Sequence, residues 1–196
     1  MYKKQMLLQK ILCLLTVITG GIAFLYSLGV MTDIYDTLFT TMPYSDHTKS
    51  DVAGSIVFYD MQDFNSALVK ATIGFILCAA VLFITGTNTR RRYYISNYFA
   101  VCLNVVYGLG FTVWAHLGLE RFKAQYLNVD FEALKAYSEM WNTRYSDSTF
   151  WFDIHYLIFG FILLIVILHV CNCVWKISLM KAEKNLVEAG KESTIG

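Results

Sequence analysis

The side chains in this sequence best suited to chemistry are two histidines, His116 and His155. Each lies at one end of a long apolar stretch, and the two ends are expected at similar depth on different helices. The favoured interpretation is that both rings only hydrogen-bond at the level of the lipid headgroups. The alternative, since imidazole nitrogens bind haem iron, is a bis-histidine haem, and the pair could equally face a quinone or a metal. His169 lies roughly 21 Å further along the same helix as His155 and has no second histidine at its level.

The rest of the sequence has no pattern typical of a catalytic centre. It contains no glycine-rich phosphate loop, no Gly-x-Ser-x-Gly motif and no His-Glu-x-x-His helix. The acidic residues of segment 32–67 do not have the spacing of a calcium-binding loop. We therefore expect no catalytic residues, no metal ligands and no cofactor, apart from haem if the histidine pair binds one.

The chain has four apolar stretches, at residues 8–31, 68–86, 94–117 and 155–174, and the last two contain these histidines. Each has about 19 to 24 residues, and a helix of that length crosses the ~30 Å hydrocarbon core of a bilayer. The chain is 56% hydrophobic and only 16% charged, well below the ~25% charged residues of soluble domains. These features predict an all-α integral membrane protein with a bundle of four transmembrane helices.

The basic residues predict how this bundle is oriented. Ten of them fall in the N-terminal segment, the joint between the second and third stretches, and the C-terminal tail: Lys3, Lys4, Lys10, Arg90, Arg91, Arg92, Lys176, Lys181, Lys184 and Lys191. The positive-inside rule places this side, with both termini, in the cytoplasm. Segments 32–67 and 118–154, about 36 residues each, then face outward. The sequence has no Asn-x-Ser/Thr site, which favours a bacterial plasma membrane.

The two halves of the chain, 1–88 and 89–196, show signs of an internal repeat. An offset of 89 residues aligns Cys13 with Cys102 and Gly21 with Gly110. An offset of 86 aligns the Gly-Phe-Ile-Leu sequences that begin at Gly74 and Gly160. We therefore predict two tandem hairpins in the same orientation, whose outer segments form a small cap, followed by a helical cytoplasmic tail over 175–196.

Within the outer segments, two local structures are expected. Asp130 is suited to cap the N-terminus of a short helix over residues 131–141, since its side-chain oxygen can accept a hydrogen bond from a backbone N–H of the first turn. Segment 54–59, Gly-Ser-Ile-Val-Phe-Tyr, is rich in β-branched and aromatic residues. That composition predicts a short strand or an extended segment.

Aromatic residues of the second outer segment are the best candidates for contacts with a partner protein, because aromatic anchors dominate interfaces. They are Tyr137, Trp141, Tyr145 and Trp151. The favoured function is a non-catalytic subunit of a larger membrane complex, a transporter or an envelope assembly, that binds a partner or ligand through its outer segments. Alternatives are an electron-transfer subunit using His116 and His155, and an oligomeric channel or small transporter. Membrane lipid and other membrane subunits are the expected partners, and nucleic acid is not.

Overall fold

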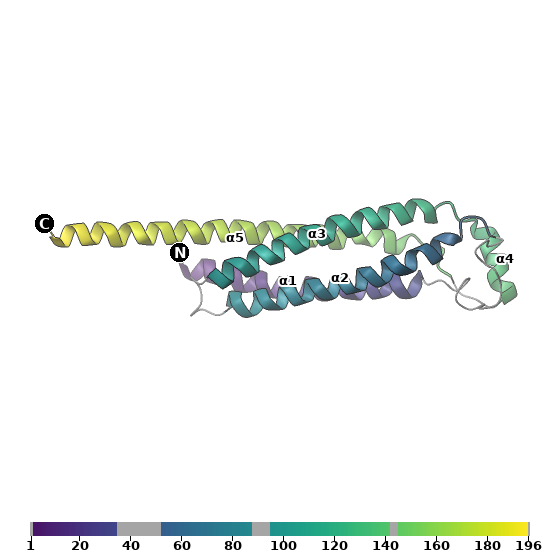
Figure 1. Cartoon of the computed structure of the whole chain (residues 1–196), viewed down its shortest axis with the longest axis horizontal. Coiled ribbons are helices and arrows are strands. Elements are labelled where there is room, and N and C mark those ends of the chain that lie inside the picture. Colours follow the sequence, from purple (N-terminus) through teal and green to yellow (C-terminus); the bar gives the residue numbers. More distant parts are fainter. Residues whose placement is uncertain (1, 35–51, 88–94, 142–144, 196) are drawn as a thin grey trace.

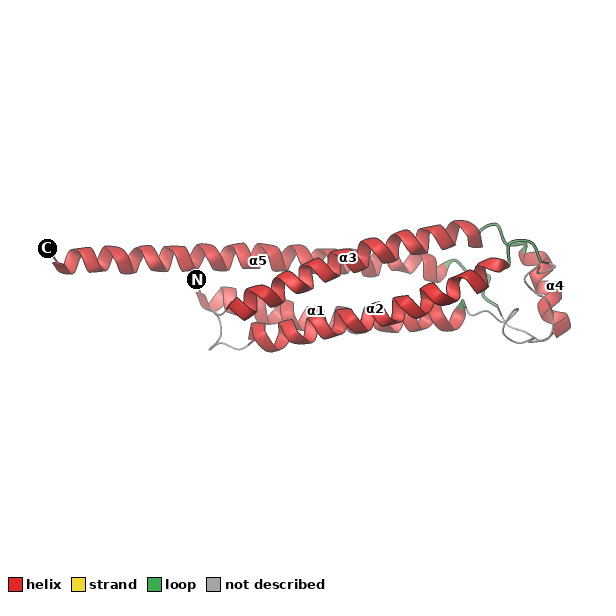
Figure 2. Ribbon diagram, viewed as in Figure 1, coloured by secondary structure: helices red, strands yellow, loops and turns green. Residues whose placement is uncertain are grey.

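The computed structural model describes residues 2–34, 52–87, 95–141 and 145–195. In these ranges the chain is all-helical and has no strand (Figure 2). Five helices follow one another: α1 (Tyr2–Asp33), α2 (Ile56–Thr87), α3 (Ile95–Tyr126), α4 (Phe131–Trp141) and α5 (Phe150–Ile195). Four of them, α1, α2, α3 and α5, are long and apolar enough to cross a membrane, which confirms the prediction of four long apolar helices.

The long helices extend beyond the apolar stretches that predicted them. α2 begins at Ile56 instead of 68, and α3 ends at Tyr126 instead of 117. A 32-residue helix is about 48 Å long, whereas the hydrocarbon core is ~30 Å thick. Part of each segment that we expected outside the membrane helices is therefore a continuation of a helix.

The start of α2 corrects the expected strand at residues 54–59. Ile56–Tyr59 form the first turn of the helix, after a turn in which Gly54 has a φ of 78°. Val57, Phe58 and Met61 are buried, a spacing that places them on one face of a helix. Packing of that face against the core overrides the strand preference of β-branched and aromatic residues.

Helix α4 covers the residues predicted for it. The backbone N–H of Ala133 donates to the Asp130 carboxylate at 3.0 Å, which confirms the expected N-cap. Leu134 is fully buried, and Lys135 and Glu139 are exposed. The backbone N–H of Asp130 also donates to the carbonyl of Ala53 at 3.0 Å, so the turn before α4 is joined to the turn before α2.

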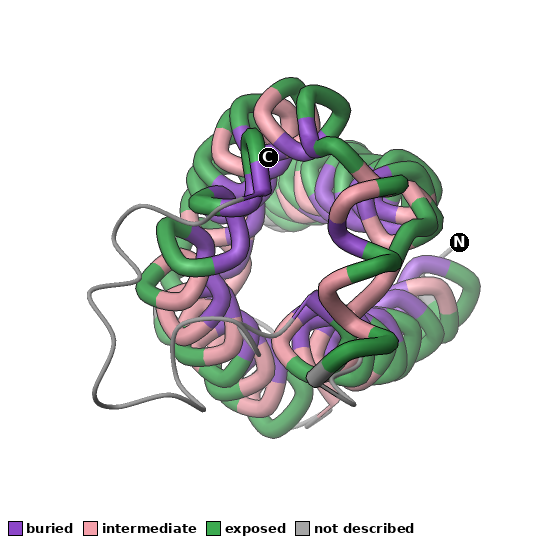
Figure 3. Tube along the Cα trace, turned by 90° about the vertical axis from the view of Figure 1, so that its right-hand side faces the viewer, coloured by how far each residue is buried: buried purple, intermediate pink, exposed green. Residues whose placement is uncertain are grey.

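The four long helices pack in a ring, in the order α1, α2, α3, α5 and back to α1. Figure 1 shows α1 and α3 running in one direction and α2 and α5 in the other, with both chain termini at one end and α4 at the opposite end. We call these the terminal end and the α4 end. Seen along the bundle, the buried residues face the centre of the ring (Figure 3). Large apolar side chains cover its outside, among them Leu25, Leu77, Val106 and Ile167.

The interior differs between the two ends. A large cluster of buried apolar residues fills the α4 half, with aromatic rings such as Phe58, Phe111, Phe152 and Phe159. Towards the terminal end, the apolar cluster is small and is built around Cys13, Leu82 and Ala100. Buried polar side chains occupy much of the remaining space there.

Candidate functional site

The structure brings His116 of α3 and His155 of α5 into direct contact at the α4 end. His116 Nδ1 lies 3.0 Å from His155 Nε2, and the ring centroids are 5.3 Å apart. His155 is fully buried, while His116 is partly exposed. The expectation that the two histidines lie at the same depth on neighbouring helices therefore holds in this structure.

The second ring nitrogen of His155 fixes its tautomer. His155 Nδ1 forms a short hydrogen bond with the backbone carbonyl of Phe152, which lies one turn earlier in α5. A carbonyl only accepts, so Nδ1 must carry the proton, and Nε2 of a neutral ring then holds a lone pair. That lone pair is directed at His116. Metal-binding histidines are commonly held in this way, with the other ring N–H donated to a backbone carbonyl or a carboxylate.

A carboxylate completes the cluster. Glu120 follows His116 by four residues, so both side chains lie on one face of α3. Glu120 Oε1 lies 3.8 Å from His155 Nε2 and accepts a hydrogen bond from the Tyr156 hydroxyl at 2.5 Å. One ligand atom from each of His116, Glu120 and His155 lies within 4.8 Å of the other two.

These separations fit a shared metal ion. Two ligands that each lie ~2.0–2.1 Å from Zn²⁺ are roughly 3.0–3.4 Å from each other. The two histidine nitrogens are 3.0 Å apart, and a bound ion would replace the proton that His116 Nδ1 donates to His155 Nε2. Glu120 Oε1, now 3.8 Å from His155 Nε2, would have to move closer to reach the same spacing. Two imidazoles and one carboxylate suit zinc, iron(II) and manganese(II), and three protein ligands leave coordination positions open.

A groove of about 280 Å³ opens beside the cluster, between α3 and α5. Its lining includes both histidines, Thr112, Phe159 and Leu163. Thr112 is only 5% exposed, and its hydroxyl has no hydrogen-bond partner among the described residues. Thr112 thus places a buried, unpartnered hydroxyl in the wall of a mostly apolar groove.

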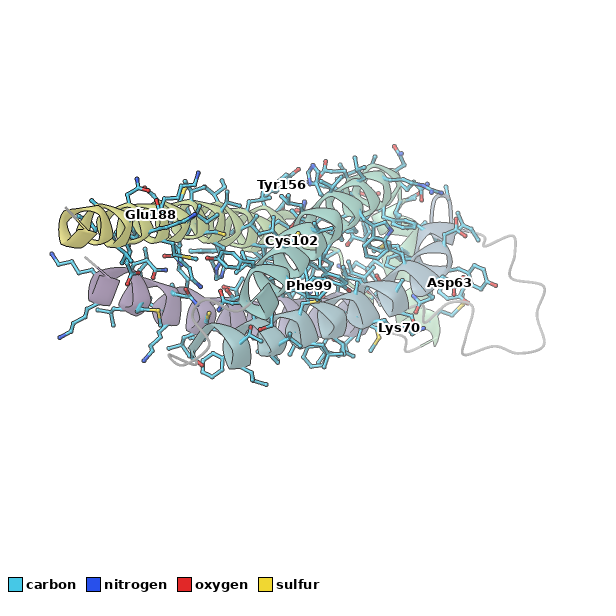
Figure 4. The ribbon with its side chains drawn as sticks, turned by 60° about the vertical axis from the view of Figure 1, so that its left-hand side comes forward. Asp63, Lys70, Phe99, Cys102, Tyr156 and Glu188 are labelled. Carbon is cyan, nitrogen blue, oxygen red and sulfur yellow. The ribbon has the colours of Figure 1, made fainter. Side chains whose placement is uncertain are left out.

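An ion pair lies next to the cluster, beside Tyr156. Lys123 Nζ lies 2.6 Å from Asp153 Oδ1, and Asp153 Oδ2 accepts a hydrogen bond from the Thr149 hydroxyl at 2.7 Å. The Lys123 ammonium also lies 5.6 Å from the centre of the Tyr156 ring. Tyr156, labelled on α5 in Figure 4, is thus held between Glu120 and this ion pair. Tyr156, which orients the Glu120 carboxylate, is therefore itself held in position by Lys123.

The aromatic residues predicted to bind a partner lie outside this cluster. Tyr137, Tyr145 and Trp151 are partly buried and pack against the chain's own core. Trp151 lies against Gly29 and donates from Nε1 to Asp33 Oδ2 at 2.7 Å, so it joins α5 to α1. Trp141 is the last residue of α4, and its side chain is outside the described residues.

A second polar feature, which the sequence analysis missed, lies inside the terminal half of the bundle. Interhelical hydrogen bonds build it, among them Gln5 to Asn172 at 3.2 Å, Gln9 to the Gly86 carbonyl at 2.7 Å, Thr16 to His169 at 2.8 Å, and Lys176 to Asn97 at 3.0 Å. We call these residues, with Asn104, the polar seam. Asn104 is 1% exposed, and neither of its amide atoms has a partner among the described residues.

The spacing of polar residues in the sequence indicates both the histidine cluster and the polar seam. Glu120 lies four residues after His116, and Gln9 lies four after Gln5. Asn97 and Asn104 are seven apart. Polar residues at these intervals in an apolar helix share one face, which then points to the interior. Tyr156 and Thr112 offer no such signal. No protein-family model, curated protein or solved structure matches this chain.

Proposed function

We propose that this protein binds a divalent transition-metal ion at the α4 end of its membrane bundle, through His116, Glu120 and His155. The observation that supports this most is the 3.0 Å separation of two imidazole nitrogens, one of which has its tautomer set by a backbone carbonyl. Tyr156 would orient the carboxylate, as outer-shell partners do in metal sites. The groove with Thr112 would give a further ligand access to the open coordination positions.

The electron-transfer alternative stays a prediction. In a bis-histidine haem, the two ring nitrogens lie on opposite faces of the porphyrin, with iron between them. His116 and His155 instead contact each other directly, so a macrocycle would have to part α3 and α5 at this level. A visible spectrum of the purified protein tests this reading, because bound haem gives a Soret band.

The metal-binding proposal is tested by titration of the full-length protein in mild detergent, purified with a tag that contains no histidine. Isothermal calorimetry with Zn²⁺ and the visible spectrum of bound Co²⁺ report stoichiometry and geometry. We expect one ion per chain. Loss of a ligand in His155→Ala or Glu120→Gln should weaken binding by on the order of 100-fold or more, and Tyr156→Phe by about 10-fold, the lower range for an outer-shell partner.

His169→Gln is the matched control, because it changes a histidine of the same helix roughly 21 Å away. A glutamine can keep the contact with Thr16 that His169 makes at 2.8 Å. We expect its affinity for Zn²⁺ to equal that of the wild type. Unchanged binding in His155→Ala, or equal loss in His169→Gln, would refute the proposed site.

We also propose an orientation for the bundle. The basic residues at the terminal end favour a cytoplasmic location for both termini, as the positive-inside rule requires. The metal site and α4 would then face outward in a bacterial plasma membrane, and the two hairpins would be tandem copies with their outer segments as a cap. Lys4→Cys and Lys135→Cys, each as the single cysteine of the chain, are treated with an impermeant thiol reagent on intact cells. Only the cysteine at residue 135 should react if both termini are cytoplasmic.

The role as a subunit of a larger complex remains a second candidate. Large apolar side chains are exposed near α4, including Leu127 at 61% and Met140 at 71%. Exposed apolar surface next to polar residues is typical of an interface with a partner. A gentle-detergent pull-down with mass spectrometry tests this candidate. Recovery of the chain alone, as a single monomeric species, would speak against it.

A further inference from the structure

A second groove lies at the terminal end, where α5 leaves the bundle beside the start of α3. Its volume is about 450 Å³, and its lining consists of Tyr98, Ile177, Met180, Lys181 and Lys184. Three of these side chains are largely apolar and two end in ammonium groups. The groove is within the size range of small-ligand pockets, and it is far from the histidine cluster, which lies at the opposite end of the same helix pair.

The floor of this groove is held in place by the polar seam below it. The Tyr98 hydroxyl contacts Met180 Sδ at 2.8 Å, which joins α3 to α5. The buried Lys176 ammonium lies 4.8 Å from the centre of the Tyr98 ring and donates to Asn97 at 3.0 Å. These contacts fix the Tyr98 ring, so the apolar wall is formed before anything binds.

Two ammonium groups, those of Lys181 and Lys184, line this groove. Lys181 and Lys184 follow Lys176 by about one and two further turns, which places them just past the apolar part of α5. Lys184 is highly exposed and lies 3.7 Å from Glu188, which Figure 4 labels on the part of α5 that stands clear of the other helices. An exposed pair of this kind is weak and leaves the ammonium available to an anion.

We propose that this groove binds one anionic phospholipid. The phosphate would lie between the Lys181 and Lys184 ammonium groups, and the upper acyl chains would lie along Ile177, Met180 and the Tyr98 ring. Charge complementarity favours this ligand, because basic pockets between membrane helices bind anionic headgroups at the cytoplasmic surface. A zwitterionic phospholipid presents no net charge to the two lysines. The proposed metal site has no part in this inference.

Native mass spectrometry of the full-length protein in mild detergent provides the test. Phosphatidylglycerol and phosphatidylcholine with identical acyl chains are titrated separately. We expect one phosphatidylglycerol to bind with at least tenfold preference. Lys181→Ala/Lys184→Ala should weaken its binding about 30-fold, from a contribution of about 1 kcal/mol for each lysine near an anionic headgroup. Alanine is the best helix former, so helix α5 is retained, and circular dichroism checks this.

The matched control is Lys3→Ala/Lys4→Ala, which removes the same charge from exposed lysines of α1 at the same end. We expect the affinity of this variant for phosphatidylglycerol to fall no more than about threefold, because these charges lie outside the groove and are partly screened. Equal loss in both double variants, or equal binding of the two lipids, would overturn the proposal in favour of general attraction to a basic surface. Displacement of the lipid by millimolar inorganic phosphate would also overturn it, because the site would then be one for the free anion.

Discussion

Replacement of the buried Asn104 by leucine should stabilise the bundle. The Asn104 side chain is 1% exposed, and neither the oxygen nor the nitrogen of its amide has a partner among the described residues. A buried polar atom without a partner costs about 1–3 kcal/mol. Leucine is similar in shape and has no polar atom, and the cost of repacking around it is about 1 kcal/mol. We expect a net gain of about 0–2 kcal/mol in the free energy of unfolding.

The same substitution two turns earlier on α3 should have the opposite effect. Asn97 accepts a hydrogen bond from the Lys176 ammonium at 3.0 Å and donates to the Thr85 carbonyl at 3.1 Å. Asn97→Leu removes both bonds, and a hydrogen bond to a charged group contributes about 1.5–3 kcal/mol. We expect a loss of about 2–4 kcal/mol.

The two variants are compared by titration with sodium dodecyl sulfate in mixed micelles, with helix content followed by circular dichroism. Their unfolding midpoints should move in opposite directions from the wild type. If Asn104→Leu lowers stability by 1 kcal/mol or more, the reasoning is refuted, because the amide must then be making favourable bonds, for example to bound water. Equal destabilisation by both variants would show that the polar seam tolerates no apolar side chain at either level.

Three further predictions use the same unfolding assay. Gly29→Ala should destabilise by about 1–3 kcal/mol, because its Cβ would lie 2.1 Å from the Trp151 ring, whereas Gly21→Ala, with nothing within 4 Å, should be neutral or stabilising. Gly54→Ala should cost about 2–4 kcal/mol, since φ is 78° and the Cβ would lie 2.6 Å from the Asn128 carbonyl oxygen; a smaller loss than in Gly29→Ala would contradict this. Trp151→Phe should lower the free energy of unfolding by about 0.5–1.5 kcal/mol, because it removes the hydrogen bond to Asp33. Adding Asp33→Asn to this variant should lower it little further, because the bond is already absent.

Apolar length was enough to predict the four membrane helices, because the bilayer requires each span to satisfy its own backbone hydrogen bonds. Helix ends were less predictable. The apolar stretches stop where the hydrocarbon core is expected to stop, but α2 and α3 continue for several turns with mixed composition. Packing of Val57, Phe58 and Met61 on the core decides that continuation, and no local pattern at 54–59 reveals it.

The candidate site was also predictable only in part from the sequence. His116 and His155 could be placed at one depth from sequence, since each lies at the same end of its apolar stretch. The four-residue spacing places Glu120 on the same face of α3 as His116, but the sequence alone did not show that this face meets His155. It also did not show that Phe152 and Tyr156 orient the ligands, because these contacts depend on the rotation of α3 and α5 about their axes. Rotation is set by packing of the whole ring. Composition and length thus determined four helices long and apolar enough to cross a membrane, whereas only the tertiary structure decided which side chains face one another within the bundle.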